Sequence, residues 1–256
     1  GYNRRFLRER DGKPEPKVYA IVESNEINRN HLRFFGPHLS ERERNLAMMQ
    51  MEELLDIFKD AREYGSILNV VACDWDVLER FVDDLGTTGQ ISFESVGSEE
   101  TQKQLRKLVR VAKNLGQKYN VVVTNPPYLS NSRFSPKLDQ YIKENYPEVK
   151  SDLSMVMYKH ALQNLCKSKG YVSFITTTSW MFLASFEKLR SYILKEYDFN
   201  SLVDFGTELF EGKVGHNPIV AWVNRKSYTD SIMTGIRLIE FCYSRRDEKK
   251  EEFFNR

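Results

Sequence analysis

Residues 119–128 read YNVVVTNPPY, an apolar run that two prolines bring to an end. A continuous apolar run of this length is typical of a buried parallel strand. Proline lacks the N–H that a central strand needs, so the strand must end before Pro126. In open α/β sheets, binding sites lie beyond the carboxyl ends of the strands. The turn at residues 125–128 therefore stands where an active site is expected.

This turn, Asn125-Pro126-Pro127-Tyr128, carries the groups needed to bind a planar amine. The Asn125 amide oxygen and the Pro126 carbonyl oxygen can both accept hydrogen bonds from an NH2 group such as that of adenine. Such bonds favour a pyramidal nitrogen whose lone pair points at a methyl donor, and the prolines hold the acceptors in place. Tyr128 offers a flat face for a base taken out of the stack. The alternative is a plain strand-ending turn in which Asn125 caps a helix.

Strand-like and helix-like patterns alternate along the rest of the chain. Before the motif, the sequence predicts strands at 17–23 and 66–71 and helices at about 40–64, 75–85 and 99–115. After the motif, it predicts helices at 153–167 and 182–195, and strands at 171–176, 202–205, 218–223 and 235–242. Ser40 and Glu43 match a capping box at the start of the first helix. This alternation predicts an α/β fold with a Rossmann-like, mostly parallel sheet.

Composition narrows the class of protein. The 256 residues are 41% apolar and 29% charged, which suits a globular domain with its own core. A net charge of +2 does not mark the whole chain as a nucleic-acid binder, so any DNA affinity must come from local basic patches. The widely spaced Cys73, Cys166 and Cys242 predict neither a metal site nor a disulfide framework. Without a secretory signal or a membrane-length apolar run, a cytoplasmic protein without a membrane partner is expected.

On these motifs the chain resembles the N6-adenine DNA methyltransferases, over most of residues 15–225. The shared features are the NPPY turn, a helix opened by Asp152 and Leu153, and the stretches 170–180, 203–206 and 209–214. The loop after NPPY is most similar to the PglX-type methyltransferases of BREX phage-defence systems, with restriction–modification fusion enzymes close to them. The resemblance implies a Rossmann-like fold dependent on S-adenosylmethionine. It also implies double-stranded DNA as substrate and other defence-system proteins as partners.

The resemblance also assigns roles to single residues. Asn125, Pro126, Pro127 and Tyr128 would form the catalytic motif. By its order along the chain, Phe210 would be a second aromatic that sandwiches the flipped adenine with Tyr128; a core phenylalanine beside a strand is the alternative. Three basic residues of the loop after the motif should border the substrate cleft and contact DNA: Arg133, Lys137 and Lys143.

One departure from the family concerns the methyl donor. These enzymes hold S-adenosylmethionine in a Gly-rich turn after the first strand, whereas this sequence contains no Gly-x-Gly. We therefore expect an N-terminally truncated sheet and a fragment that is inactive alone, and the residues that bind the donor stay unknown. Residues 17–23 and the pair Asp74 and Asp76 are candidates for contacts to the donor's adenine, with helix capping as the alternative.

The expected organisation is a partial catalytic domain at residues 1–226, with insertions at about 28–118. Residues 227–256 would form a strand and a charged segment leading to the rest of a larger protein. Two other functions stay open: methylation of protein glutamine or of RNA, and a catalytically inactive methyltransferase fold that only binds. A row of basic residues on the 99–115 helix predicts either a phosphate-tracking surface or a solvated helix face: Lys103, Arg106, Lys107, Arg110 and Lys113.

Overall fold

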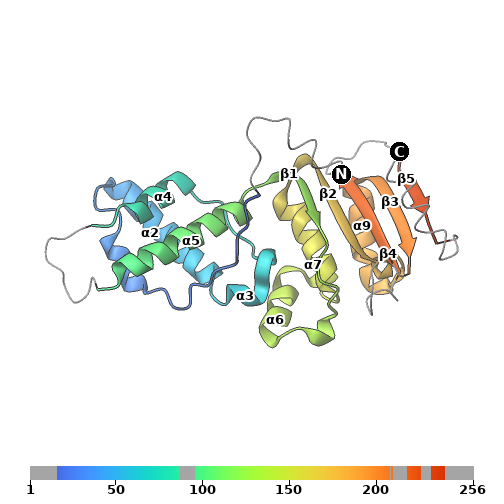
Figure 1. Cartoon of the computed structure of the whole chain (residues 1–256), viewed down its shortest axis with the longest axis horizontal. Coiled ribbons are helices and arrows are strands. Elements are labelled where there is room, and N and C mark those ends of the chain that lie inside the picture. The colour runs from blue at the N-terminus through green and yellow to red at the C-terminus, as the bar shows by residue number, and fades with distance from the viewer. Residues whose placement is uncertain (1–15, 87–95, 208, 210–217, 226–231, 240–256) are drawn as a thin grey trace.

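The molecule has two parts, a unit of helices and a unit built on a sheet. A computed structural model describes residues 16–86, 96–207, 209, 218–225 and 232–239. Residues 16–118 form the part that we call the helical unit, and the described residues from 119 onward form the sheet unit. The two units lie side by side along the longest axis of the molecule (Figure 1).

The helical unit is built around α2, α4 and α5. Its elements are η1 (Arg29–Phe34), α2 (Glu41–Ile57), α3 (Ala61–Tyr64), η2 (Gly65–Ile67), α4 (Trp75–Asp83) and α5 (Ser98–Gly116). The predicted capping box is confirmed, because Ser40 and Glu43 exchange hydrogen bonds at the start of α2. Apolar faces of the three long helices meet in a core that contains Leu54, Phe81 and Leu105.

Three predictions for this unit were wrong. Residues 17–23 and 66–71 form no strand; the first are extended chain, and the second begin with the turn η2. Val22 and Leu68 pack against the helices of this unit, whereas Ile67 packs into the core of the sheet unit and Val18 is exposed. The helix predicted at 40–64 is broken after Ile57, and Asp60 adopts a left-handed backbone with φ of 55°. Short apolar runs cannot by themselves distinguish a strand from a buried turn.

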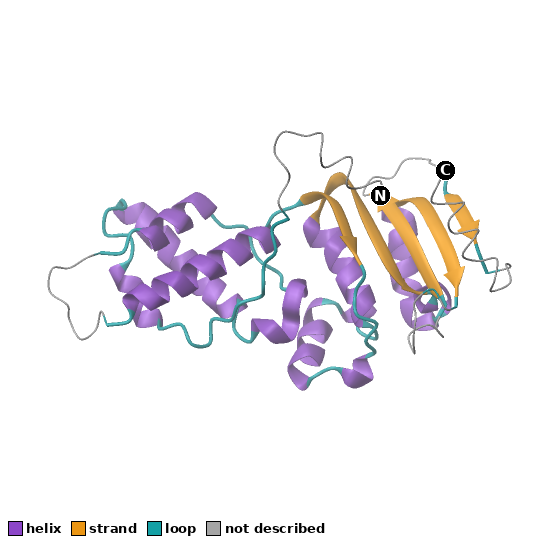
Figure 2. Cartoon of the chain, viewed as in Figure 1, coloured by secondary structure: helices purple, strands orange, loops and turns teal. Residues whose placement is uncertain are grey.

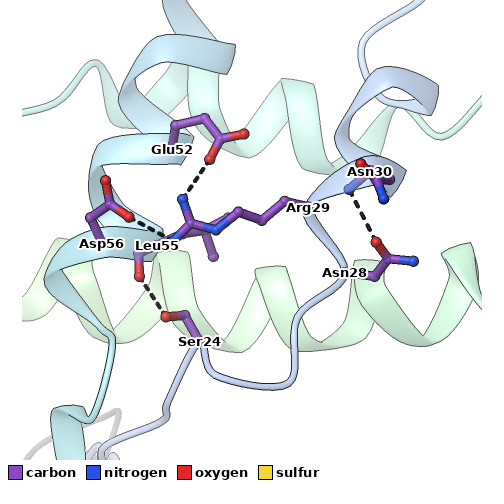
Figure 3. Close-up of polar contacts among 7 residues, drawn as sticks. All are labelled: Ser24, Asn28, Arg29, Asn30, Glu52, Leu55 and Asp56. Carbon is purple, nitrogen blue, oxygen red and sulfur yellow. Dashed lines mark hydrogen bonds and ion pairs between the residues drawn. The ribbon is translucent and has the colours of Figure 1, made fainter.

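The extended chain before η1 is fastened to α2. The Ser24 hydroxyl donates to the Leu55 carbonyl oxygen, while the guanidinium of Arg29 binds both Glu52 at 2.8 Å and Asp56 at 2.6 Å (Figure 3). The Ser24 backbone N–H also donates to the Phe58 carbonyl oxygen at 3.1 Å. These bonds fix the direction in which the chain enters the unit.

The sheet unit contains five strands in the spatial order β1-β2-β4-β3-β5. Their bounds are β1 (Tyr119–Thr124), β2 (Cys166–Thr177), β3 (Asp198–Gly206), β4 (Ile219–Arg225) and β5 (Thr234–Arg237). The β1–β2 and β3–β5 pairs are parallel, whereas β4 is antiparallel to both β2 and β3. The predicted α/β fold is confirmed, but the sheet is mixed rather than mostly parallel. No helix predicted from the sequence separates β3 from β4, and strands joined without a crossover helix pair antiparallel.

The helices of the sheet unit lie after β1 and after β2. They are η4 (Asn131–Arg133), α6 (Pro136–Asn145), η5 (Pro147–Val149), α7 (Leu153–His160), the π-helical turn η6 (Ala161–Leu165), α8 (Ser179–Phe182), η7 (Ala184–Phe186) and α9 (Glu187–Glu196). Two predicted helices, 153–167 and 182–195, are thus shorter and broken. Figure 2 shows the helices packed beside the strands. Buried rings such as Tyr158, Phe174 and Trp222 fill the core between sheet and helices.

The first strand, β1, lies at an edge of the described sheet, so the prediction of a buried strand was wrong. Among the described residues it pairs only with β2. Val122 packs into the core, but its neighbours Val121 and Val123 are 56% and 70% exposed. A strand edge with exposed valines is a surface on which further chain can pair.

Neither a membrane span nor a metal cluster appears in the described ranges. No helix there combines the length and the apolar character needed to cross a bilayer. The same residues hold no group of three or more His, Cys, Asp or Glu side chains suited to bind a metal ion. Cys73 is a free thiol, Cys166 is buried, and Cys242 lies outside the described residues.

Candidate active site

The NPPY turn lies at the carboxyl edge of the sheet, as the sequence predicts. Asn125 follows β1 directly, and Thr124 pairs with Phe174 of β2. The strands β1, β2 and β3 run in one direction, so their carboxyl ends line the same edge. The Asn125 side chain is exposed there, whereas Pro126 is buried. The turn thus presents the amide to solvent from a fixed backbone.

A hydrogen bond inside the motif orients the Asn125 amide. The Tyr128 hydroxyl donates to Asn125 Oδ1 at 3.0 Å and lies 3.2 Å from the Ile175 carbonyl oxygen at the end of β2. Burial raises the pKa of Tyr128, so the hydroxyl remains a donor at neutral pH. An amide oxygen has two lone pairs, and one stays available for an incoming N–H. The contact with Ile175 could not be predicted from the sequence, because Ile175 is far from the motif along the chain.

The ring of Tyr128 rests on a small apolar cluster at the same edge. The buried members are Phe205, Ile219 and Leu238, and the half-buried Tyr128 and Leu209 pack against them. The segment after β3 therefore comes close to the motif through Leu209. Phe210, the predicted second aromatic, lies outside the described residues.

The loop after the motif is tied to the start of α7. The Leu153 N–H donates to the Leu129 carbonyl oxygen at 2.9 Å, and the Asn131 N–H donates to the Ser151 carbonyl oxygen at 3.1 Å. Asp152 caps α7 by accepting a hydrogen bond from the Ser154 N–H at 2.8 Å, which confirms that it opens a helix. Both ends of the NPPY turn are thus held, one by β1 and the other by α7.

The three predicted DNA contacts lie in different electrostatic surroundings. Lys137 forms an ion pair of 2.8 Å with Asp60 of the helical unit, which raises the pKa of Lys137 and lowers that of Asp60. Lys143 is 2.5 Å from Asp139, one turn away on α6. Arg133 is exposed at the end of η4 and makes no ion pair with any described residue. Only Arg133 therefore presents a charge that no nearby acid offsets.

The candidate donor contacts do not lie at the sheet. Asp74 accepts a hydrogen bond from the Val77 N–H at 3.1 Å and caps α4, so the capping alternative is confirmed for it. Residues 17–23 belong to the helical unit, and Asp76 lies in the first turn of α4. In the described part of the chain no strand precedes β1. The described residues therefore do not include the Gly-rich turn with which the family binds its methyl donor.

Comparison with known proteins places the chain among DNA-modifying methylases. The Eco57I restriction-modification methylase family matches residues 38–210. The adenine-specific methyltransferase PglX of Lacticaseibacillus casei is 31% identical over 209 residues, and the adenine-specific methyltransferase BrxX of Escherichia coli O9:H4 is 28% identical over 208 residues. These matches cover 80% and 79% of this chain but only 17% and 16% of those proteins.

A similar solved structure is that of the Type ISP restriction-modification enzyme LlaGI, as a nuclease-deletion mutant with a DNA substrate mimic. It has a TM-score of 0.41 and 18% sequence identity, and the match covers 64% of this chain and 18% of LlaGI. The family match spans more than half of the chain and includes the NPPY turn. The chain belongs to the Eco57I restriction-modification methylase family.

Proposed function

We propose that the chain is a part of the catalytic domain of an adenine-N6 DNA methyltransferase that serves phage defence or restriction–modification. The observation that carries this proposal is the turn at residues 125–128, in which the Tyr128 hydroxyl orients the exposed Asn125 amide at the carboxyl edge of the sheet. Family membership supports methyl transfer as the reaction. The names of the relatives PglX and BrxX support adenine as the acceptor.

The proposed roles concern the acceptor side of the reaction. Asn125 Oδ1 and the Pro126 carbonyl oxygen accept hydrogen bonds from the adenine N6 amine, which keeps its lone pair out of the ring. Pro127 fixes the turn, and Tyr128 stacks on the flipped base. Phe210 is the proposed second aromatic, and the packing of Leu209 near Tyr128 supports that place for the segment.

S-adenosylmethionine is the donor that the family implies, and it supplies the methyl group when bound. These 256 residues hold no Gly-x-Gly turn for it. Because the chain covers about a sixth of its relatives' length, we propose that the donor-binding site lies elsewhere in the intact protein. The residues described above act on the amine only, and the 256 residues alone should not transfer a methyl group.

The proposed organisation keeps residues 1–226 as a partial catalytic domain that the helical unit interrupts, with residues 227–256 leading toward further parts of the protein. Arg133 is the first candidate for a DNA contact, because Lys137 and Lys143 already have acidic partners. An enzyme of this kind works on double-stranded DNA in the cytoplasm, alongside other proteins of the defence system.

The test is a transfer assay with the full-length protein, a tritiated methyl donor and unmethylated phage DNA. We expect label in N6-methyladenine, and a loss of about 100-fold or more in Asn125→Ala, since a preorganised polar contact at a reacting group contributes that much. Asn145→Ala is the matched control, because Asn145 is an exposed asparagine on α6 outside the motif. Label in protein or RNA but not in DNA would overturn the substrate, and no label from a folded, donor-binding protein would overturn the activity.

Two variants of Tyr128 separate its hydroxyl from its ring. Tyr128→Phe keeps the stacking face but removes the bond to Asn125 Oδ1, and a rate loss of about tenfold is expected for one lost hydrogen bond. Tyr128→Ala also removes the stacking face, worth about 1–3 kcal/mol for a base on an aromatic ring, so its loss should be larger. Equal rates in the wild type and Tyr128→Phe would show that the hydroxyl does not orient the amide.

A further inference from the structure

The helical unit carries a basic groove that the proposed catalytic turn does not use. The groove has a volume of about 400 Å³ and lies between α5 and the extended chain near Tyr19. Four cations of α5 line one wall: Lys103, Arg106, Lys107 and Arg110. The other lining residues are apolar or aromatic, and no acidic side chain lines the groove within the described part of the chain.

The four cations differ in whether an acidic side chain lies close enough to neutralise their charge. Arg106 binds Asp83 at 2.7 Å, and Lys103 lies 3.6 Å from Glu100. Lys107 and Arg110 are exposed and form no ion pair with any residue that the structure describes. The groove therefore holds at least two uncompensated positive charges, although the whole chain has a net charge of only +2. Such a local excess is what a polyanion recognises.

The spacing of the cations matches a row of phosphates. Lys103, Lys107 and Arg110 stand at i, i+4 and i+7 on α5, so they share one face of the helix. At 1.5 Å per residue they cover roughly 10 Å along the axis. Each DNA strand carries about one phosphate per 3.4 Å of helix axis, so a row of this length laid along the axis passes about three phosphate steps.

The groove is also held in place relative to the NPPY turn. α5 ends at Gly116, two residues before β1, the strand that leads to Asn125. The Tyr119 hydroxyl donates to the Asn114 carbonyl oxygen at 2.7 Å, and the Gln117 side chain donates to the Tyr119 hydroxyl at 2.6 Å. On the opposite wall, the bonds of Ser24 to the end of α2 fasten the chain that follows the Tyr19 segment (Figure 3).

We propose that this groove binds the phosphate backbone of double-stranded DNA beside the base that enters the active site. The inference rests on the proposed function, because it takes DNA as the substrate. It adds a second anchoring surface on the helical unit, joined to β1 by a hydrogen-bonded junction. The uncompensated charges of Lys107 and Arg110, in a groove without an acidic lining residue in the described part of the chain, favour a nucleic-acid backbone over an acidic peptide.

The test compares two double variants of the full-length protein. Lys107→Ala/Arg110→Ala removes the two uncompensated charges, whereas Lys188→Ala/Lys195→Ala removes two exposed charges of α9 in the sheet unit. Affinity for a DNA duplex is measured by fluorescence anisotropy over a range of salt concentrations. The groove variant should bind at least about tenfold more weakly at low salt and lose about 2 from the slope of log K against log salt. The α9 variant should keep both values.

Each outcome decides one of the two proposals. Unchanged DNA affinity and an unchanged salt slope in the groove variant overturn the proposal that the groove binds DNA, even if the wild type methylates DNA. Reduced affinity for an acidic peptide with unchanged affinity for DNA overturns it as well. If the groove variant binds DNA more weakly but the wild-type protein does not methylate DNA, the groove proposal is supported and the proposed function is overturned. Lys107→Arg/Arg110→Lys should restore the slope, because the charges return.

Discussion

The helical unit and the sheet unit build their interiors from different side chains. The core of the helical unit is mainly aliphatic, with leucines such as Leu54 and Leu105 at its centre. The core of the sheet unit is rich in rings: Trp222 lies 5.1 Å from Tyr158 and 4.6 Å from Trp180, measured between ring centroids. Closely packed aromatic rings have few alternative arrangements. The sheet unit should therefore hold its carboxyl edge, and thus the NPPY turn, rigidly.

The surfaces differ as well. Ion pairs join different helices of the helical unit, among them Arg80 with Glu43 and Lys113 with Glu79. The sheet unit has such pairs as well, such as Lys159 with Glu148, but it also carries the exposed amide of the NPPY turn, Asn125. Under the proposals above, the sheet unit orients the acceptor amine and the helical unit presents positive charge to DNA. With separate cores, the two units should respond independently to substitutions in their interiors.

Trp222→Ala should destabilise the sheet unit by about 3–5 kcal/mol, since it empties a fully buried site among three other rings. Hydrogen exchange in the full-length protein should show lost protection in the strands, with α2 and α5 unaffected. Trp222→Phe keeps a ring in place and should cost less. Equal loss of protection in both units would show that they unfold as one block.

Leu54→Ala is the reciprocal change, at a fully buried leucine of α2. A cost of about 2–5 kcal/mol is expected from lost burial and the cavity left behind. Hydrogen exchange should then rise in the helical unit, while Trp222 and its neighbours keep their protection. Leu54→Met retains most of the volume and serves as the control. Exchange that rises first in the strands would contradict the separation of the two cores.

The stability of the sheet unit should fall in mild acid because of His160. Burial lowers the pKa of His160 to about 4, while an unfolded histidine has a pKa of about 6.5. The unfolded chain therefore binds the proton first, and the stabilising effect of the neutral ring is present above about pH 6.5 and is lost as the pH falls toward 4. Unfolding of the sheet unit should require about 2 kcal/mol less at pH 5 than at pH 7.

Urea unfolding of the full-length protein at the two pH values, followed by hydrogen exchange in α7, measures this effect. In His160→Gln the difference between pH 7 and pH 5 should shrink by about the same 2 kcal/mol, because the titrating ring is gone. A pH dependence that stays undiminished in this variant would assign the acid sensitivity to other groups.

Ser40→Ala should have the smallest effect, about 1 kcal/mol, confined to the first turn of α2. The Ser40 hydroxyl accepts a hydrogen bond from the Glu43 N–H, and alanine leaves that N–H without its cap. Amide exchange at the start of α2 is the measurement, with Ser40→Thr as a capping control. Exchange that rises also in α5 would show that this cap stabilises the whole unit.

The sequence predicted the parts of the fold that local rules decide. A capping box marked the start of α2, and an apolar run before two prolines marked β1 and the turn after it. Each of these signals lies within a few residues of the feature that it predicts. That is why the motif at residues 125–128 could be placed at the correct edge of the sheet.

Features that depend on distant contacts could not be predicted. The run at 17–23 has strand-like residues, but Val18 and Tyr19 are exposed, while Ile21 and Val22 pack against helices instead of a neighbouring strand. The reversed direction of β4 depends on which strands it meets in space. Likewise, nothing in the sequence shows that Asp60 lies 2.8 Å from Lys137, which was predicted to contact DNA because of its place in the loop after NPPY. The bond from Tyr128 to Asn125 is local, but its geometry comes from the packing of β2 beneath the ring.

The exposed edge of β1 has a consequence for how this polypeptide behaves in a test tube. Val121 and Val123 stand beside backbone groups that no described strand pairs with. Produced alone, the 256 residues should self-associate edge to edge as their concentration rises, which light scattering would detect. Val123→Lys should suppress that association, because a charge on an open strand discourages a second copy from adding to it.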